Sequence, residues 1–133
     1  MRIRAILRSM VSVDIQAYVE AWRRRFCEAE RAREERARTA RSLLPLLAGH
    51  LVRQYGARRV WVFGSLAEGG FHDRSDIDLA VEGLSPGSAL FRAGADLDDL
   101  ARPFRVDLVP IEDARDEVRA HVLRHGEMIR DAG

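Results

Sequence analysis

Apolar and polar positions divide the chain into long helical stretches near its start and short strands further on. From Asp14 to Arg41 there is no glycine or proline, which predicts one long helix with an N-cap at Ser12 or Asp14. Its apolar positions recur at spacings of four and three, at Ile15, Val19, Trp22, Phe26 and Ala29. A second helix is predicted from Ser42 to Tyr55, with Pro45 in its first turn.

A buried strand is predicted at Val60–Phe63, because the run is continuous, β-branched and aromatic. Gly64 and Ser65 follow it as a tight turn, and Ser65–Glu68 can form a short helix. The first N–H groups of a helix have no partner within it and carry a partial positive charge. A turn of this kind suits a phosphate group.

Three aspartates interrupt apolar strands. Asp76 and Asp78 fall on one face of a strand at Ile77–Val81, and Asp107 interrupts a β-like run at Arg105–Val109. If the two strands pair side by side, the three carboxylates converge into a hard-oxygen site suited to Mg²⁺. A solvated strand start is the alternative interpretation, but it does not explain three acids on otherwise apolar strands.

The remaining stretches are predicted to be helices. Ser85–Pro86 has the N-cap and N1 chemistry that starts a helix, and the helix is expected to run to about Ala101. Its expected inward residues are Leu90, Phe91, Leu97 and Leu100, and its expected solvated acids are Asp96, Asp98 and Asp99. A final helix is expected from Asp113, with Gly126 as its C-cap.

Two histidines of that final helix, His121 and His125, have the spacing of a two-histidine metal site. The sequence offers no third ligand near them, so we interpret them as a surface or half-buried pair.

Composition narrows the class of protein. The 133 residues suit one compact domain with a core, since 47% are hydrophobic. No apolar run reaches the length of a membrane span. Cys27 is the only cysteine, which excludes an internal disulfide, favours a reducing cytoplasm and predicts a packed thiol. There is no lysine, so a P-loop lysine and Schiff-base chemistry within this chain are excluded.

The net charge of +1 hides an uneven distribution. Up to Arg41 there are eleven arginines against six acids, and from Ser42 onward eleven arginines against fifteen acids. Nucleic-acid binding across the whole molecule is therefore not expected, although the basic N-terminal segment could contact a nucleic acid or an acidic protein. Met1 and Met10 are both candidate start residues.

Gly-Ser, then Asp-x-Asp, then a later Asp on its own strand resembles the nucleotidyltransferase superfamily of DNA polymerase β. The length of the chain points to its minimal nucleotidyltransferase branch. The resemblance covers about Ser42 to the C-terminus, so the expected domains are a minimal nucleotidyltransferase domain at 42–133 and an N-terminal helical extension at 1–41. It implies an α/β (α+β) nucleotidyltransferase fold, with a small mixed β-sheet flanked by helices and an extra long N-terminal helix.

The resemblance also implies an activity, the transfer of a nucleoside monophosphate from an NTP, with ATP as the expected donor, to a hydroxyl group. In this family two Mg²⁺ ions and the triphosphate are held by residues that match Asp76, Asp78, Asp107, Gly64 and Ser65 here, and we add Arg74 and Ser75 as helpers. Members often carry arginine directly after the Gly-Ser pair, whereas this chain has Leu66, with Glu68 close behind.

Stand-alone proteins of this branch resemble antitoxins that silence a HEPN-domain ribonuclease toxin by adding AMP to a tyrosine. We therefore expect a cytoplasmic antitoxin that contacts a HEPN toxin through Ile15, Val19, Trp22 and Phe26. Two alternatives for these residues are a homo-oligomer and a solvated helix whose apolar residues fold back on its own domain. Two further alternatives are a small-molecule, aminoglycoside-like nucleotidyltransferase, which normally needs an added C-terminal domain, and a non-catalytic binding module.

Overall fold

The computed structural model of the protein describes residues 2–133, with side chains described from Asp14 onward. The elements in chain order are α1 (Arg2–Tyr55), β1 (Arg59–Phe63), α2 (Ser65–Glu68), β2 (Ile77–Glu82), α3 (Ser88–Leu100), β3 (Val106–Pro110), η1 (Ile111–Asp113), α4 (Asp116–His125) and β4 (Glu127–Asp131). Tertiary contacts divide the chain into two units, Met1–Glu34 and Glu35–Gly133. Met1, one of the two candidate start residues, lies outside the described residues, so the choice between Met1 and Met10 stays a prediction.

The second unit contains a four-stranded sheet with the order β3-β2-β1-β4. β2 and β3 are parallel, whereas β1 is antiparallel to both β2 and β4. The predicted small mixed sheet is therefore confirmed, together with its flanking helices.

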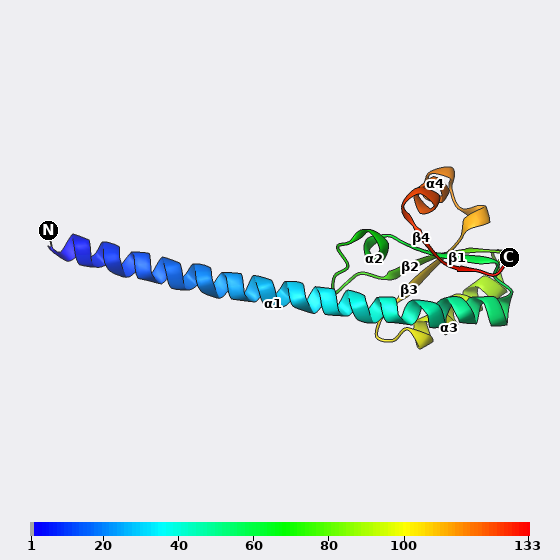
Figure 1. Ribbon diagram of the computed structural model, residues 1–133, viewed down its shortest axis with the longest axis horizontal. Coiled ribbons are helices and arrows are strands. Elements are labelled where there is room, and N and C mark those ends of the chain that lie inside the picture. The colour runs from blue at the N-terminus through cyan, green and yellow to red at the C-terminus, as the bar shows by residue number, and fades with distance from the viewer. Residues whose placement is uncertain (1) are drawn as a thin grey trace. The chain divides into compact units, whose positions relative to one another are not determined.

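Helices cover both faces of this sheet (Figure 1). The part of α1 from Glu35 onward and α3 pack on one face, where the main core includes Ala40, Leu44, Leu47, Leu51, Val60, Val62, Leu79, Val81, Ala93 and Leu97. α4 and η1 pack on the other face, around Trp61, Ala80, Ile111 and Val122. Alternation along β1 and β2 sends successive side chains to these two opposite layers, so both strands are buried over most of their length.

The two predicted N-terminal helices are one helix, α1, which already begins at Arg2. Ser42 does not cap a new helix, because its hydroxyl donates a hydrogen bond back to the Thr39 carbonyl at 2.6 Å. Pro45 lies inside α1 rather than in a first turn. Proline there removes one helix hydrogen bond, and the burial of Leu44 and Leu47 on either side compensates for that loss.

α3 begins at Ser88 rather than at Ser85, because Pro86 and Gly87 form a turn and Gly87 has a φ of 138°. The helix accordingly buries Ala93 and Leu97. Phe91 was expected to face inward but is 80% exposed.

β4 was not predicted. It follows Gly126, which ends α4, and it pairs with β1 as an edge strand whose only partly buried residue is Ile129. Cys27 was expected to be packed, but it is exposed in this chain. Among the residues that the structure describes, no helix is both long and apolar enough to cross a membrane.

Candidate active site

Gly64 connects β1 to α2 in a conformation that only glycine adopts readily. Its φ is +71°, and a Cβ at this position would collide with the Asp78 carboxylate. The Gly64 carbonyl accepts hydrogen bonds from the N–H groups of Ala67 and Glu68, at 3.2 and 2.9 Å. The expected short helix at Ser65–Glu68 is confirmed, and it begins directly after Gly64, against which the Asp78 carboxylate of β2 lies.

The three aspartates of the sequence prediction come from two neighbouring strands. Asp78 of β2 lies directly opposite Asp107 of β3 in the parallel register, and Phe63 of β1 lies on its other side. Asp76 precedes β2 by one residue. The expected pairing of the two aspartate-bearing strands is therefore confirmed. Asp76 and Asp107 are exposed, whereas Asp78 is partly buried.

Burial and two neighbouring negative charges make ionisation of Asp78 unfavourable. Partial burial is the largest cause, followed by repulsion from Asp107 and then from Asp76, and together they raise the pKa of Asp78 from 3.8 to about 6. Acids placed this way are poised to bind a positive charge.

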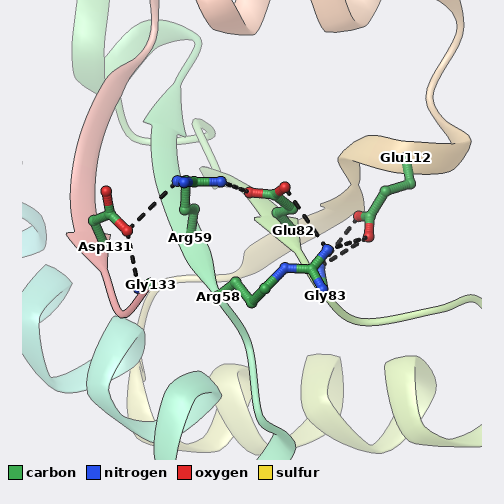
Figure 2. Close-up of polar contacts among 7 residues, drawn as sticks. All are labelled: Arg58, Arg59, Glu82, Gly83, Glu112, Asp131 and Gly133. Atoms are coloured by element: carbon green, nitrogen blue, oxygen red, sulfur yellow. Dashed lines mark hydrogen bonds and ion pairs between the residues drawn. The ribbon is translucent and has the colours of Figure 1, made fainter.

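The opposite end of the same strands shows what happens where cations are present (Figure 2). Arg59 at the start of β1 lies opposite Glu82 at the end of β2 and donates a 2.8 Å hydrogen bond to it. Arg59 also pairs with Asp131, and Arg58 pairs with Glu82 and Glu112. By contrast, no arginine or histidine among residues 14–133 pairs with any of the three aspartates beside Gly64.

The three aspartates beside Gly64 thus have no cationic partner among residues 14–133, which leaves them free to bind a divalent cation. Carboxylate oxygens are the ligands that Mg²⁺ prefers. Burial first, and repulsion from Asp107 and Asp76 second, raise the pKa of Asp78, and a bound cation would offset both effects. Within the described part of the chain, no three acidic, histidine or cysteine side chains are already close enough together to hold a metal ion. The strand register fits the cation, and the carboxylates have to turn toward one another to bind it.

Arg74 and Ser75 lie in the loop before Asp76, where they form a compact turn with His72. The Ser75 hydroxyl accepts a hydrogen bond from the His72 N–H at 3.0 Å, and the Arg74 N–H donates to His72 Nδ1 at 3.1 Å. Ser75 is therefore already used in shaping the loop. The Arg74 guanidinium is exposed and forms no hydrogen bond or ion pair with residues 14–133.

A cavity of about 490 Å³ adjoins the carboxylates and includes Asp76 and Asp107 in its wall. Arg102 and Arg105 line it too, and sequence reasoning did not single them out. Arg102 lies in the turn that follows α3 and Arg105 directly precedes β3, so the fold, rather than the local sequence, places them beside the carboxylates.

Leu66 and Glu68, the departures from the family pattern, both have structural partners. Leu66 is 4% exposed and belongs to the core, so this position in α2 points into the protein. Glu68 lies 3.1 Å from Nε2 of His121 in α4. The Leu66 carbonyl accepts a 2.9 Å hydrogen bond from Nη2 of Arg41, a contact that sequence reasoning also missed.

His121, His125 and Asp96 lie outside the turn at Gly64 and make contacts of other kinds. His121 and His125 lie with ring centroids 5.0 Å apart, and neither joins a metal-binding group within the described residues. Asp96 was expected to be solvated, but it accepts hydrogen bonds from Tyr55 at 2.6 Å and from His50 at 2.9 Å. The Tyr55 bond, followed by that of His50, lowers the pKa of Asp96.

Comparison with known proteins agrees with this geometry. The family model for polymerase β nucleotidyltransferases matches residues 49–132. A minimal nucleotidyltransferase of known structure is 32% identical, with a TM-score of 0.58, over 68% of this chain and 93% of that one. A toxin-antitoxin structure with AMP-PNP is 25% identical, with a TM-score of 0.57, over 65% of this chain and 73% of that one.

A third structure, that of a tri-AMPylated Shewanella oneidensis HEPN toxin in complex with its MNT antitoxin, shares the fold. It is 22% identical, with a TM-score of 0.51, over 68% of this chain and 71% of that one. No match was found among curated protein sequences. The family model covers more than half of the chain and includes the Gly64 turn and all three strand aspartates, so this protein belongs to the polymerase β nucleotidyltransferase family and is a nucleotidyltransferase.

Proposed function

We propose that the protein transfers AMP from ATP to a hydroxyl group, in a reaction that depends on Mg²⁺. The observation that carries this proposal is the register of Asp78 opposite Asp107, beside the turn at Gly64 and without a cationic partner among residues 14–133. Similarity to a toxin-antitoxin structure with AMP-PNP supports an adenine nucleotide as the donor. ATP as donor and a single cysteine fit a protein that works in the cytoplasm.

The chain's own residues have distinct roles in this proposal. The first N–H groups of α2 and the Ser65 hydroxyl bind the β- and γ-phosphates, where negative charge grows as pyrophosphate leaves. Asp107 accepts the proton of the attacking hydroxyl, whose oxygen forms a bond to the α-phosphorus while the bond from that phosphorus to the β-phosphate oxygen breaks. Arg74 and Ser75 assist at the edge of the site.

Asp76, Asp78 and Asp107 would hold two Mg²⁺ ions, which supply charge neutralisation for the triphosphate and for the attacking oxygen. Before a cation binds, the carboxylates repel one another. Aspartate-to-asparagine changes at these positions therefore test metal binding and transfer together.

The proposed acceptor is a tyrosine of a cognate HEPN-domain ribonuclease toxin, which makes the protein an antitoxin. Residues 42–133 carry the nucleotidyltransferase in this proposal, and residues 1–41 form a helical extension that contacts the toxin. Support comes from an exposed apolar seam on α1, where Ile15 and Trp22 are each 57% exposed and Phe26 is 49% exposed. Trp22 and Phe26 stack with ring centroids 5.7 Å apart, and such exposed aromatic residues are typical of interfaces.

The test uses the purified chain with Mg²⁺, each labelled NTP in turn and a candidate HEPN partner, with the intact mass of the partner as the measurement. We expect the partner to gain the mass of one or more AMP groups with ATP only, and we expect no gain with the Asp76→Asn variant. A partner that binds tightly but gains no mass would overturn the enzymatic proposal and favour a non-catalytic binding module. Transfer to a small hydroxylated molecule instead of the protein would favour the small-molecule alternative.

A further inference from the structure

Arg36 of α1 contacts the two loops that lead into the aspartate-bearing strands. Its Nη2 donates a hydrogen bond to the Asp73 carbonyl at 3.1 Å. Its guanidinium carbon lies 5.8 Å from the ring centroid of Phe71 and 4.7 Å from that of Phe104. Both rings are buried, and their centroids are 6.0 Å apart. One side chain therefore holds together two segments that are distant in sequence.

These two segments determine where Asp76 and Asp107 lie. Phe71 belongs to the loop between α2 and β2, which ends at Asp76, and Phe104 lies just before β3 and Asp107. The Ile77 N–H donates to the Arg105 carbonyl at 2.8 Å, so the two segments join at the residue that follows Asp76. A shift of either loop would change the spacing of the carboxylates.

The chemistry of Arg36 indicates a role other than packing. Its Nε is buried and has no hydrogen-bond partner among the described residues. A buried donor without an acceptor destabilises the folded chain, so an apolar side chain of similar length would fill this place with little loss of stability. Such a side chain could not reach the Asp73 carbonyl with a hydrogen-bond donor. The guanidinium group is therefore better explained by where it holds the loop than by stability.

Arg41, also on α1, forms a corresponding contact with the turn at Gly64. Its Nη2 donates to the Leu66 carbonyl at 2.9 Å, and its Nη1 lies 3.3 Å from the Glu127 carboxylate of β4. Leu66 is in the middle of α2, whose first residues follow Gly64. Arg41 thereby connects α2 to α1 and to the edge strand.

We propose that Arg36 and Arg41 are positioning residues, through which α1 holds the aspartate-bearing loops and the phosphate-binding turn in place for nucleotidyl transfer. Arg36 sets the spacing of Asp76 and Asp107, and Arg41 sets the position of α2. The inference rests on the proposed function, since it assigns a purpose to the same site.

The test compares Arg36→Met and Arg41→Met with the wild-type chain and with Arg38→Met as control. Arg38 is an exposed arginine of α1 that forms no hydrogen bond or ion pair within the described part of the chain. Three quantities are measured: the midpoint of thermal unfolding, the Kd for Mn²⁺ by electron paramagnetic resonance, and kcat and KM for ATP with the HEPN partner as acceptor.

For Arg36→Met we expect Mn²⁺ binding and kcat each to fall about 10- to 100-fold, with little change in the KM for ATP. For Arg41→Met we expect the KM for ATP to rise about tenfold, with unchanged Mn²⁺ affinity, because the phosphate-binding turn rather than the carboxylates is displaced. The unfolding midpoints should stay close to that of the Arg38→Met control. A merely structural role would lower the unfolding midpoints of both variants, and it would not confine the loss of Mn²⁺ affinity to Arg36→Met and the rise in KM to Arg41→Met.

The proposal is overturned if Arg36→Met binds Mn²⁺ and turns over like Arg38→Met. If Arg36→Met fails to fold, Arg36→Gln decides, because glutamine stays polar but places no positive charge over the rings of Phe71 and Phe104. Mn²⁺ affinity of Arg36→Gln equal to wild type would then refute the role. If the wild-type chain transfers nucleotide to no acceptor, the proposed function fails, and the Mn²⁺ comparison still decides the role of Arg36.

Discussion

Asp78→Asn should stabilise the metal-free protein while abolishing its activity. The carboxyl of Asp78 has a pKa of about 6 in the folded chain against 3.8 for an unperturbed aspartate. A shift of about 2 pKa units corresponds to about 3 kcal/mol at most, at 1.36 kcal/mol per unit. The side chain is only partly buried, so solvent screening reduces the expected cost of its negative charge to about 1–2 kcal/mol.

The sign of this effect fixes its pH dependence. Because the folded-state pKa of Asp78 is raised, the folded chain binds its proton more tightly than the unfolded chain does. The corresponding stability is fully present below pH 3.8 and is lost as the pH rises through about 6. The stability advantage of Asp78→Asn should therefore be near zero at about pH 3 and reach its full size above about pH 7.

The assay is thermal unfolding followed by circular dichroism in EDTA, at a series of pH values, with Asp113→Asn as control. Asp113 is an exposed aspartate of η1, away from the site. At pH 8 we expect the midpoint of Asp78→Asn to exceed that of wild type by about 3–8 °C. Added Mg²⁺ should stabilise wild type by about 1.4 kcal/mol at ten times its Kd and should not stabilise Asp78→Asn.

An Asp78→Asn midpoint equal to or below that of wild type at pH 8 in EDTA would refute the reasoning, since burial and the two neighbouring acids would then not destabilise ionised Asp78. An Mg²⁺ effect that survives the substitution would show that the ion binds elsewhere.

Three further substitutions test other parts of the structure. Gly64→Ala places a side chain on a residue with positive φ and against the Asp78 carboxylate. We therefore expect the free energy of unfolding to fall by about 1–3 kcal/mol and ATP binding to weaken. An unchanged Kd for ATP would contradict this expectation. Leu47→Ala opens a cavity at a fully buried position and should cost about 2–5 kcal/mol in urea unfolding, whereas a loss below 1 kcal/mol would show that the site collapses around it. Phe26→Ser should weaken capture of the HEPN partner while leaving the unfolding midpoint of the chain nearly unchanged, and unchanged affinity would exclude the α1 seam as the docking surface.

The elements that carry the site were predictable because their signals are local. A continuous apolar run predicts β1, alternation predicts β2, and Gly64 between them is required by its backbone conformation. Asp107 within an apolar stretch predicts β3. The sequence therefore predicts that the aspartates converge if the two strands pair, whereas the parallel orientation and the register of Asp78 opposite Asp107 come from the structure.

β4 could not be predicted, because its pairing with β1 rather than its own composition makes it a strand. Glu127, Met128, Arg130 and Asp131 are all exposed and mostly polar, and only Ile129 packs against the core. An edge strand has one open side, so it tolerates charged residues that would be excluded from a central strand. A local pattern shows nothing of this, since the partner strand lies more than sixty residues earlier.

The helix break that we expected before Ser42 and the contacts of Arg36 and Arg41 that we did not expect have one explanation. Sequence reasoning ended the first helix at Arg41, which left Arg36 and Arg41 among the many arginines of a basic extension. In the structure α1 is continuous, and its position is fixed by Leu44, Leu47 and Leu51 in the core. A continuous helix transmits that position to the preceding turns, where Ala40 is fully buried. The two arginines are thus placed on the loops of the site by residues that follow them in sequence, and a chain begun at Ser42 would lack both contacts.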